Sequence, residues 1–239
     1  MSSTVENRVI RYGSFPIAYE VVRSSRRRTL GISVHRDQSV QVRAPKGLAT
    51  HEIDLRVEKR ASWILKHQRK FALLPPVVEK KYIKGETHRY LGKDYILRPK
   101  VGTKIKVTIV THYIDVESRS MERSALLRGI LKWYSEQAKA YFPSRMEINQ
   151  SRFQNLALPE FSLRVRRMRS RWGSCSPKGV ITLNSRLMEH SVSVIDYVIT
   201  HELCHLFIPN HSKQFYQLMS KVMPNWKELR EKLKGQEGI

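Results

Sequence analysis

The sequence predicts an α+β fold in which a β-rich N-terminal half precedes a mainly helical half that contains a small sheet. Two patterns support this prediction. Before residue 120, short β-branched and aromatic runs are separated by Gly, Ser and Asp, as in strands joined by turns. After residue 120, apolar residues recur at three- and four-residue spacing, as on one face of a helix. We therefore expect a β-rich region at 1–119 and a second region at 120–239.

The first region is expected to contain two groups of strands separated by one helix. A helical pattern begins at Thr50 and continues to about Phe71, and Pro75 and Pro76 then end it. The strands expected before and after this helix are Arg8–Tyr12, Ile17–Val22, Leu30–Val34, Val40–Val42, Tyr82–Leu91, Tyr95–Leu97, Lys104–Val110 and Tyr113–Val116, with a turn at Gly92–Asp94.

The second region begins with a helical pattern from Met121 to about Asn149, which Pro143 is expected to kink or divide. Two strand candidates follow this helix, and helices then continue to the end of the chain. The strands are expected at Ser162–Met168 and Val180–Asn184, and the helices at Ser193–Phe207, Lys213–Val222 and Asn225–Leu233.

The chain is strongly basic, with 44 Lys and Arg against 21 Asp and Glu and a formal net charge of +23. Both halves contribute, since residues 1–120 hold 25 basic and 11 acidic side chains and residues 121–239 hold 19 and 10. This charge favours contact with polyanions, so nucleic acid is one expected partner. The alternative is a solvated basic surface that only keeps the protein in solution, and no recognised DNA- or RNA-binding signature is present.

The cysteine content and the apolar segments indicate the cellular compartment. Cys175 and Cys204 are too few for a disulfide scaffold and fit a reducing environment. The N-terminus lacks the apolar stretch of a signal peptide, and no apolar run approaches the about 20 residues needed to span a bilayer. We therefore expect a cytoplasmic protein that has no membrane partner.

The segment VITHELCHLFIPNH contains the motif His-Glu-x-x-His. On a helix, His201 and His205 are separated by about 40° of rotation and about 6 Å of rise, so both imidazoles can face one ion. Glu202 is close enough for its carboxylate to reach a water on that ion. The alternative is a pair of core histidines held by hydrogen bonds, which would bury three polar groups, one a carboxylate, at high cost. The motif therefore predicts one divalent metal ion, Zn²⁺ in the first instance.

A catalytic zinc site usually has a third protein ligand and one position for water. We expect His211 to be this ligand. Pro209 disfavours helical geometry before it and Asn210 suits a turn, so the chain can fold back beside the helix end. The competing candidates are two downstream carboxylates, Glu228 and Glu231.

Around this motif, the stretch 166–219 resembles the YgjP-like metallopeptidase family. The shared segments are Arg171–Ser176, Ile181–Asn184, Asp196–Val198, His201–His205, His211–Lys213 and Phe215. The family usually has Trp after this Phe, and Tyr216 stands there instead. The same His-Glu-x-x-His-x5-His spacing also resembles SprT-type proteases, which act on proteins crosslinked to DNA. The resemblance implies a zincin-like catalytic core at 120–239 with three histidine ligands.

Five arginines crowd eight positions before the Trp-Gly-Ser-Cys-Ser segment: Arg164, Arg166, Arg167, Arg169 and Arg171. They either protect an edge strand from aggregation or form an anion-recognition wall beside the metal. Arg171 is the one expected to act, by stabilising an oxyanion, because it abuts the segment that the resemblance places near the site. Val180–Asn184 is expected to be an ordinary sheet strand, the alternative being a strand that holds an extended substrate.

These residues predict a metal-dependent hydrolase in which Glu202 takes a proton from water as the water attacks a carbonyl or phosphoryl centre. Three functions are compatible with the sequence. The first is a zinc metallopeptidase, with nucleic-acid-associated protein as one substrate class. The second is a metal-dependent nucleotide phosphoanhydride hydrolase, which the arginines and the high charge suit. The third is a nucleic-acid-binding module whose metal is structural.

Overall fold

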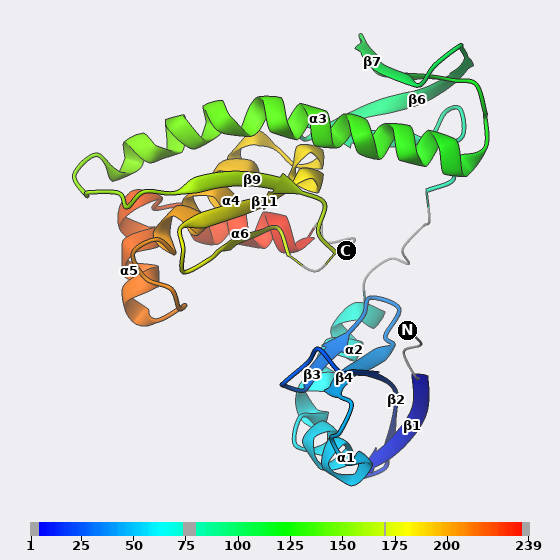
Figure 1. The fold of residues 1–239 in the computed structure, drawn as a ribbon, viewed down its shortest axis with the longest axis vertical. Coiled ribbons are helices and arrows are strands. Elements are labelled where there is room, and N and C mark those ends of the chain that lie inside the picture. The colour runs from blue at the N-terminus through cyan, green and yellow to red at the C-terminus, as the bar shows by residue number, and fades with distance from the viewer. Residues whose placement is uncertain (1–4, 74–79, 170, 236–239) are drawn as a thin grey trace. The chain divides into compact units, whose positions relative to one another are not determined.

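The computed structural model describes residues 5–73, 80–169 and 171–235. Within these residues the protein is a mixed α+β fold of six α-helices and three small sheets (Figure 1). The predicted fold class is confirmed, since strands dominate the N-terminal half and helices the C-terminal half. The chain forms two compact units, one up to residue 79 and one from residue 80 onward.

The boundary between the compact units differs from the division at 119/120 expected from the sequence. The strands between residues 87 and 118 belong to the second unit. Leu97 and Ile114 are part of the same buried cluster as Leu126 and Ile130 of the following helix. Composition alone placed these strands with the other β-rich segment.

The first unit is a four-stranded sheet covered by two helices. Its strands lie in the order β1 (Val5–Tyr12), β2 (Phe15–Ser24), β4 (Val40–Pro45) and β3 (Gly31–Val34). The single helix expected here is two, α1 (Thr50–Glu58) and α2 (Ala61–Ala72), separated at residues 59–60.

The break between these helices lets both reach the same core. Val57 near the end of α1 and Ala61 at the start of α2 are both fully buried with strand residues such as Val21 and Val42. The proline pair expected to end the second helix, Pro75–Pro76, lies outside the described residues.

The second unit begins with a sheet in the order β5 (Thr87–Tyr90), β6 (Lys93–Val101), β8 (Tyr113–Ser118) and β7 (Lys106–Val110). The turn between β5 and β6 consists of Leu91 and Gly92, both with positive φ, and so begins one residue before the expected position. A Cβ at Gly92 would lie 2.8 Å from the Cα of Ser191, so this turn requires glycine.

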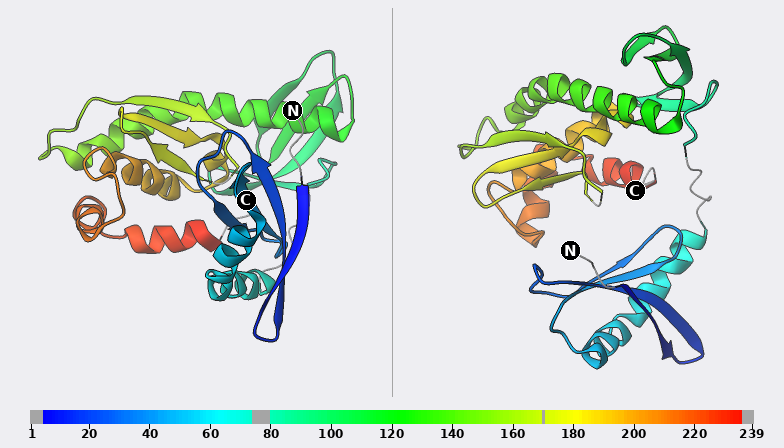
Figure 2. Two further views of the ribbon diagram at one scale, coloured as in Figure 1. Left: turned by 60° about the horizontal axis from the view of Figure 1, so that its bottom comes forward. Right: turned by 45° about the vertical axis from the view of Figure 1, so that its right-hand side comes forward.

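The long helix α3 (Arg123–Gln150) follows and continues through Pro143 without dividing. After it come β9 (Ser162–Arg166), β10 (Gly173–Cys175) and β11 (Val180–Asn184), which pair in the order β10-β11-β9. The two views of Figure 2 both show α3 running beside this sheet. The sequence predicted β9 and β11 but not β10, because three residues are too few to show an alternating pattern.

The remaining helices are α4 (Val192–Cys204), α5 (Lys213–Val222) and α6 (Trp226–Gly235). Ten residues of α4 are buried, which places this helix in the centre of the second unit between α3, β10, β11 and α6. Any polar side chain on α4 therefore needs a partner or a function. None of the described helices is both long and apolar enough to cross a membrane.

Candidate metal centre

Three histidines converge at the C-terminal end of α4. His201 lies in the last turn of the helix, His205 follows its last residue, and His211 lies in the loop before α5. Their Nε2 atoms form a triangle with edges of 2.9 Å (His201–His211), 3.1 Å (His205–His211) and 3.2 Å (His201–His205). Within the described residues, this is the group of His, Cys, Asp and Glu side chains whose geometry could hold a metal ion.

The size of this triangle fits one transition-metal ion. Two nitrogens bound to the same zinc at about 2.0–2.1 Å can lie no more than about 4.2 Å apart. All three edges are well within this limit. Nitrogen donors from imidazole suit zinc and its neighbours in the first transition series rather than Ca²⁺ or Mg²⁺. The residues present therefore fit the group that the motif implies.

The loop after α4 folds back through local hydrogen bonds. The helix closes with the N–H groups of Phe207 and Ile208 donating to the carbonyl of Cys204. Pro209 then follows, and the side chain of Asn210 accepts from the N–H of Ser212 at 3.2 Å. This turn returns His211 to the end of α4, on the same side as His201 and His205.

The ring of Phe215 fixes the orientation of the three imidazoles. Phe215 is fully buried, and its centroid lies 4.9 Å from that of His201, 4.6 Å from His205 and 4.9 Å from His211. A further constraint acts on His205, whose Nδ1 is 3.0 Å from the carbonyl of Ile208. When Nδ1 carries the proton and donates to this carbonyl, the Nε2 lone pair faces the other two histidines.

Burial favours the neutral form of His201 and His211. Desolvation, followed by the charges of His205, His211 and Arg230, lowers the pKa of His201 to about 3. The pKa of His211 is also lowered, first by desolvation and then by His205 and Arg230. Neutral imidazoles have free lone pairs for a cation, so His201 and His211 can bind a metal without losing protons first.

Glu202 is the buried acid of the centre. It is 4% exposed, and its Oε2 atom has no hydrogen-bond partner within the described structure. Desolvation raises the pKa of Glu202 to about 8, while the charge of Arg171 acts in the opposite direction. A buried oxygen without a partner is costly, so Glu202 is a candidate for a functional group rather than a packing residue.

Strand β10 forms the wall beside Glu202. A Cβ built on Gly173 would lie 2.5 Å from Glu202 Oε1 and 2.7 Å from its Cγ, so the carboxyl group occupies the space that the glycine leaves. Gly173 is not among the site residues predicted from the sequence. Its position in the Trp-Gly-Ser-Cys-Ser segment is a signal that could have indicated a role in the site. The contact between Gly173 and Glu202 could not be predicted, because these residues are far apart in the chain.

Asp196 holds the opposite side of α4. Its carboxylate accepts from Nε of Arg145 at 2.9 Å and from the amide of Asn149 at 2.8 Å, both on α3. Thr200 of α4 donates to the side-chain oxygen of Asn149 at 3.1 Å. These bonds lie on the face of α4 away from the histidines, so they fix the rotation of the helix that carries His201 and Glu202.

The five arginines of the predicted wall are exposed and lie on two elements. Arg164 and Arg166 share the exposed face of β9, as the period-two pattern predicts. Arg167, Arg169 and Arg171 follow in the connection to β10. Of the five, Arg171 is the one whose charge acts on Glu202, and its carbonyl accepts from the side chain of Asn184 at 2.9 Å.

The other candidates from the sequence lie elsewhere. Glu228 is paired with Lys232 on α6, and neither Glu228 nor Glu231 belongs to the histidine cluster. Cys204 is fully buried with its sulfur 3.4 Å from that of Met219. Strand β11 lies between β10 and β9, so it has no open edge for a substrate and is an ordinary sheet strand.

The family model described as the YgjP-like metallopeptidase domain matches residues 28–236, which include the three histidines and Glu202. The chain belongs to the YgjP-like metallopeptidase family. This membership assigns it to the metal-dependent peptidases, and the cofactor that the family implies is a divalent metal. No curated protein matches the chain.

Two solved structures are similar to part of this YgjP-like chain. The metallopeptidase zymogen abylysin of Pyrococcus abyssi is 22% identical, with a TM-score of 0.36, over 40% of this chain and 93% of its own. The metallopeptidase zymogen jannalysin of Methanocaldococcus jannaschii is 22% identical, with a TM-score of 0.33, over 38% of this chain and 93% of its own.

Proposed function

We propose that the protein is a zinc-dependent peptidase in which His201, His205 and His211 hold the metal and Glu202 is the general base. The observation that carries the proposal is the convergence of three Nε2 atoms within 3.2 Å of one another beside a buried carboxyl group. Family membership supplies the peptidase class, and the geometry supports the assignment of these four residues.

The chemistry of the site divides between the metal and Glu202. A zinc ion held by three imidazoles supplies Lewis acidity that activates water near neutral pH. Glu202 accepts the proton of the attacking water and transfers it to the amine that leaves. The absence of a hydrogen-bond partner at Oε2 keeps this oxygen available for the proton. Arg171 is proposed as a nearby positive charge that favours the ionised form of Glu202 and developing negative charge on the substrate.

The open edge of β10 supports an extended peptide as the substrate. Among the described strands, β10 pairs only with β11. Asn184 donates to the carbonyl of Trp172 and Ser176 donates to that of Val180, so alternate residues pair inward. Gly173 and Cys175 therefore point their N–H and C=O groups to the open edge, where a peptide can add as a further strand.

A cavity of about 350 Å³, lined by Cys175 of β10, supports space for a substrate side chain. It reaches from His205 and Leu206 at the end of α4 to the turn between β10 and β11. The wall on the turn side is formed by Cys175, Ser176 and Lys178. A peptide paired with β10 would thus have one side chain next to the metal centre.

Metal analysis combined with an activity assay tests the assignment. The purified wild type should contain close to one zinc per chain and cleave an unfolded protein such as reduced casein. The variant His211→Ala should lose zinc and activity together. Glu202→Gln should retain zinc and lose activity by about 10²- to 10⁴-fold. Full activity in Glu202→Gln would exclude Glu202 as the base, and zinc retention in His211→Ala would exclude His211 as a ligand.

The finer proposal for the substrate is protein associated with nucleic acid. It is supported by the net charge of +23 and by the exposed Arg167 and Arg169 between β9 and β10. Addition of DNA should accelerate cleavage of a DNA-binding protein but not of casein.

A second assay tests the alternative of phosphoanhydride hydrolysis, in which wild type and Glu202→Gln are both given nucleoside triphosphates. Glu202-dependent release of phosphate or pyrophosphate, without peptide cleavage, would replace the peptidase proposal with phosphoanhydride hydrolysis.

A further inference from the structure

Strand β9 presents an open backbone edge on the side of the sheet away from β10. Among the described strands it pairs only with β11, in parallel. The N–H of Ser162 donates to the carbonyl of Gly179 at 3.0 Å, which sets the direction in which successive backbone groups point. Because these groups alternate along a strand, Ser162, Arg164 and Arg166 pair with β11. The N–H and C=O groups of Leu163 and Val165 therefore point outward.

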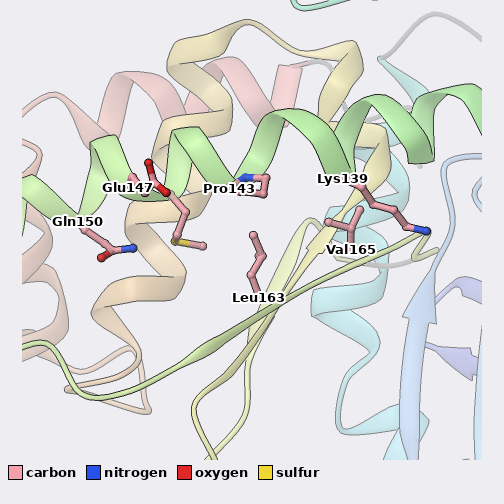
Figure 3. Close-up of a pocket in the computed structure, with 7 residues that line it drawn as sticks. Lys139, Pro143, Glu147, Gln150, Leu163 and Val165 are labelled. Carbon is pink, nitrogen blue, oxygen red and sulfur yellow. The ribbon is translucent and has the colours of Figure 1, made fainter.

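A cavity of about 450 Å³ lies beside this edge, between β9 and α3 (Figure 3). The side chains of Leu163 and Val165 form its floor, and Pro143 and Met146 of α3 form its opposite wall. The same two residues of β9 thus provide both free backbone groups and an apolar surface. This combination differs from a protected edge strand, which lacks an apolar groove beside it.

Helix α3 contributes Lys139 and Pro143, which are four residues apart on the helix. Both residues line the cavity, where Figure 3 shows them on the same side of the helix. The side chain of Lys139 adds a positive charge to this lining, whereas that of Glu147 adds a negative charge.

The face of β9 opposite to the groove is basic. Arg164 and Arg166 are exposed there, on alternate positions from the apolar pair. A strand added at the edge of β9 would have the same alternation, with one set of side chains directed to the groove and the other to the arginines. Charge complementarity therefore selects a segment in which apolar residues alternate with acidic residues.

We propose that the edge of β9 and the groove under α3 form a docking site for an extended acidic segment of another protein, which adds to the sheet as a fourth strand. The segment binds through backbone hydrogen bonds to Leu163 and Val165. Its apolar side chains enter the groove, and its carboxylates pair with Arg164 and Arg166. The site is separate from the histidine centre and does not depend on the proposed peptidase chemistry.

The proposal is tested by the anisotropy of a labelled peptide of about eight alternating Glu and Val residues, titrated with the full chain. Val165→Pro should weaken binding by at least about tenfold, because it removes an outward N–H, whereas the backbone groups that pair with β11 belong to Ser162, Arg164 and Arg166. Val165→Ala retains that N–H and should bind more tightly than Val165→Pro. N-methylation of alternate peptide amides should also abolish binding. Equal affinity of both Val165 variants and the wild type would overturn the proposal.

Charge reversal separates this site from general attraction to a basic protein. Arg164→Glu with Arg166→Glu should weaken peptide binding by at least about tenfold. The matched control is Arg26→Glu with Arg28→Glu, which changes the net charge equally in the first unit and should leave affinity within about twofold. Equal losses in both double variants would overturn the proposal. Single-stranded DNA could instead compete with the peptide and bind with an affinity that Val165→Pro does not change. This result would assign the arginine face to nucleic acid and would also overturn the proposal.

Discussion

Helix α4 carries two buried carboxyl groups whose surroundings are opposite. Asp196 faces α3, where Arg145 and Asn149 satisfy both of its oxygens. Glu202 faces β10, and one of its oxygens has no hydrogen-bond partner in the described structure. The two residues are less than two helical turns apart and are similarly buried, at 7% and 4% exposure.

The difference teaches that burial alone does not identify a functional acid. A carboxylate whose partners are all supplied by the fold contributes to the position of the helix. A carboxyl group with an unsatisfied oxygen next to three converging histidines adds to the energetic cost of folding and is available for chemistry. The two sides of α4 should therefore respond in different ways to substitution.

The largest effect is expected at Asp196. Replacing Asp196 with Ala leaves the guanidinium of Arg145, whose side chain is 18% exposed, without its partner. The free energy of unfolding should fall by about 3–5 kcal/mol, measured by urea denaturation. The control is Asp94→Ala, which removes an exposed ion pair with Arg89 and should change stability by no more than about 1 kcal/mol. A loss at Asp196 as small as that at Asp94 would show that the network does not hold α4.

A substitution at Gly173 tests whether β10 positions the carboxyl group of Glu202. In Gly173→Ala the new methyl group would meet the carboxyl group of Glu202 at 2.5 Å, so one of them must move. Peptidase activity should fall about 10- to 100-fold while the zinc content stays unchanged, because a small displacement of a reacting group is costly. Gly47→Ala is the matched control, since a Cβ there meets no atom within 4 Å. Unaltered activity in Gly173→Ala would contradict the role of β10 as the wall of the site.

The pH dependence of stability in the metal-free protein separates the contribution of Glu202 from those of His201 and His211. The pKa of His201 falls from 6.5 to about 3 on folding, so its burial makes stability rise between pH 3 and pH 6.5. The pKa of Glu202 rises from 4.5 to about 8, so folding retains a proton that the unfolded chain has lost, and stability falls as pH rises through this range. Between pH 6.5 and pH 8 His201 no longer changes the stability, and the loss of stability caused by Glu202 remains.

In that interval the metal-free wild type should lose up to roughly 1 kcal/mol per pH unit, followed as a decreasing melting temperature after chelation. Glu202→Gln should remove most of the slope. The control is Glu136→Gln, which changes a glutamate of α3 whose side chain is 58% exposed and should leave the slope of stability against pH unchanged. The prediction fails if the two variants have the same slope.

The smallest effect is expected at Arg171. Its positive charge lowers the pKa of Glu202, so Arg171→Ala should raise this pKa. The acid limb of the kcat/KM profile against pH should then move to higher pH by a fraction of a unit, while Arg171→Lys should preserve it. A large loss of kcat without a shift of the limb would instead indicate direct contact between Arg171 and the substrate.

Local patterns were sufficient for some elements and for the convergence of the three histidines. Val180–Asn184 and Lys213–Val222 have the predicted bounds, since each has one clear period and a distinct boundary. The meeting of His201 and His205 follows from helical spacing, and a proline and an asparagine indicated the turn that brings His211 to them. Shifted or divided elements, such as the helix broken at residues 59–60, depend on contacts with a distant core.

The sequence by itself determined the α+β class, the basic character, and a helix that presents two histidines and a glutamate to one point. Only the tertiary structure decided that Gly173 makes room for Glu202, that Asp196 is satisfied by α3, and that the β5–β8 sheet joins the second unit. The physical reason is the distance along the sequence over which each interaction acts. Helical periodicity and turn propensity act over a few residues, whereas burial and carboxylate pairing depend on segments that meet only when the core closes.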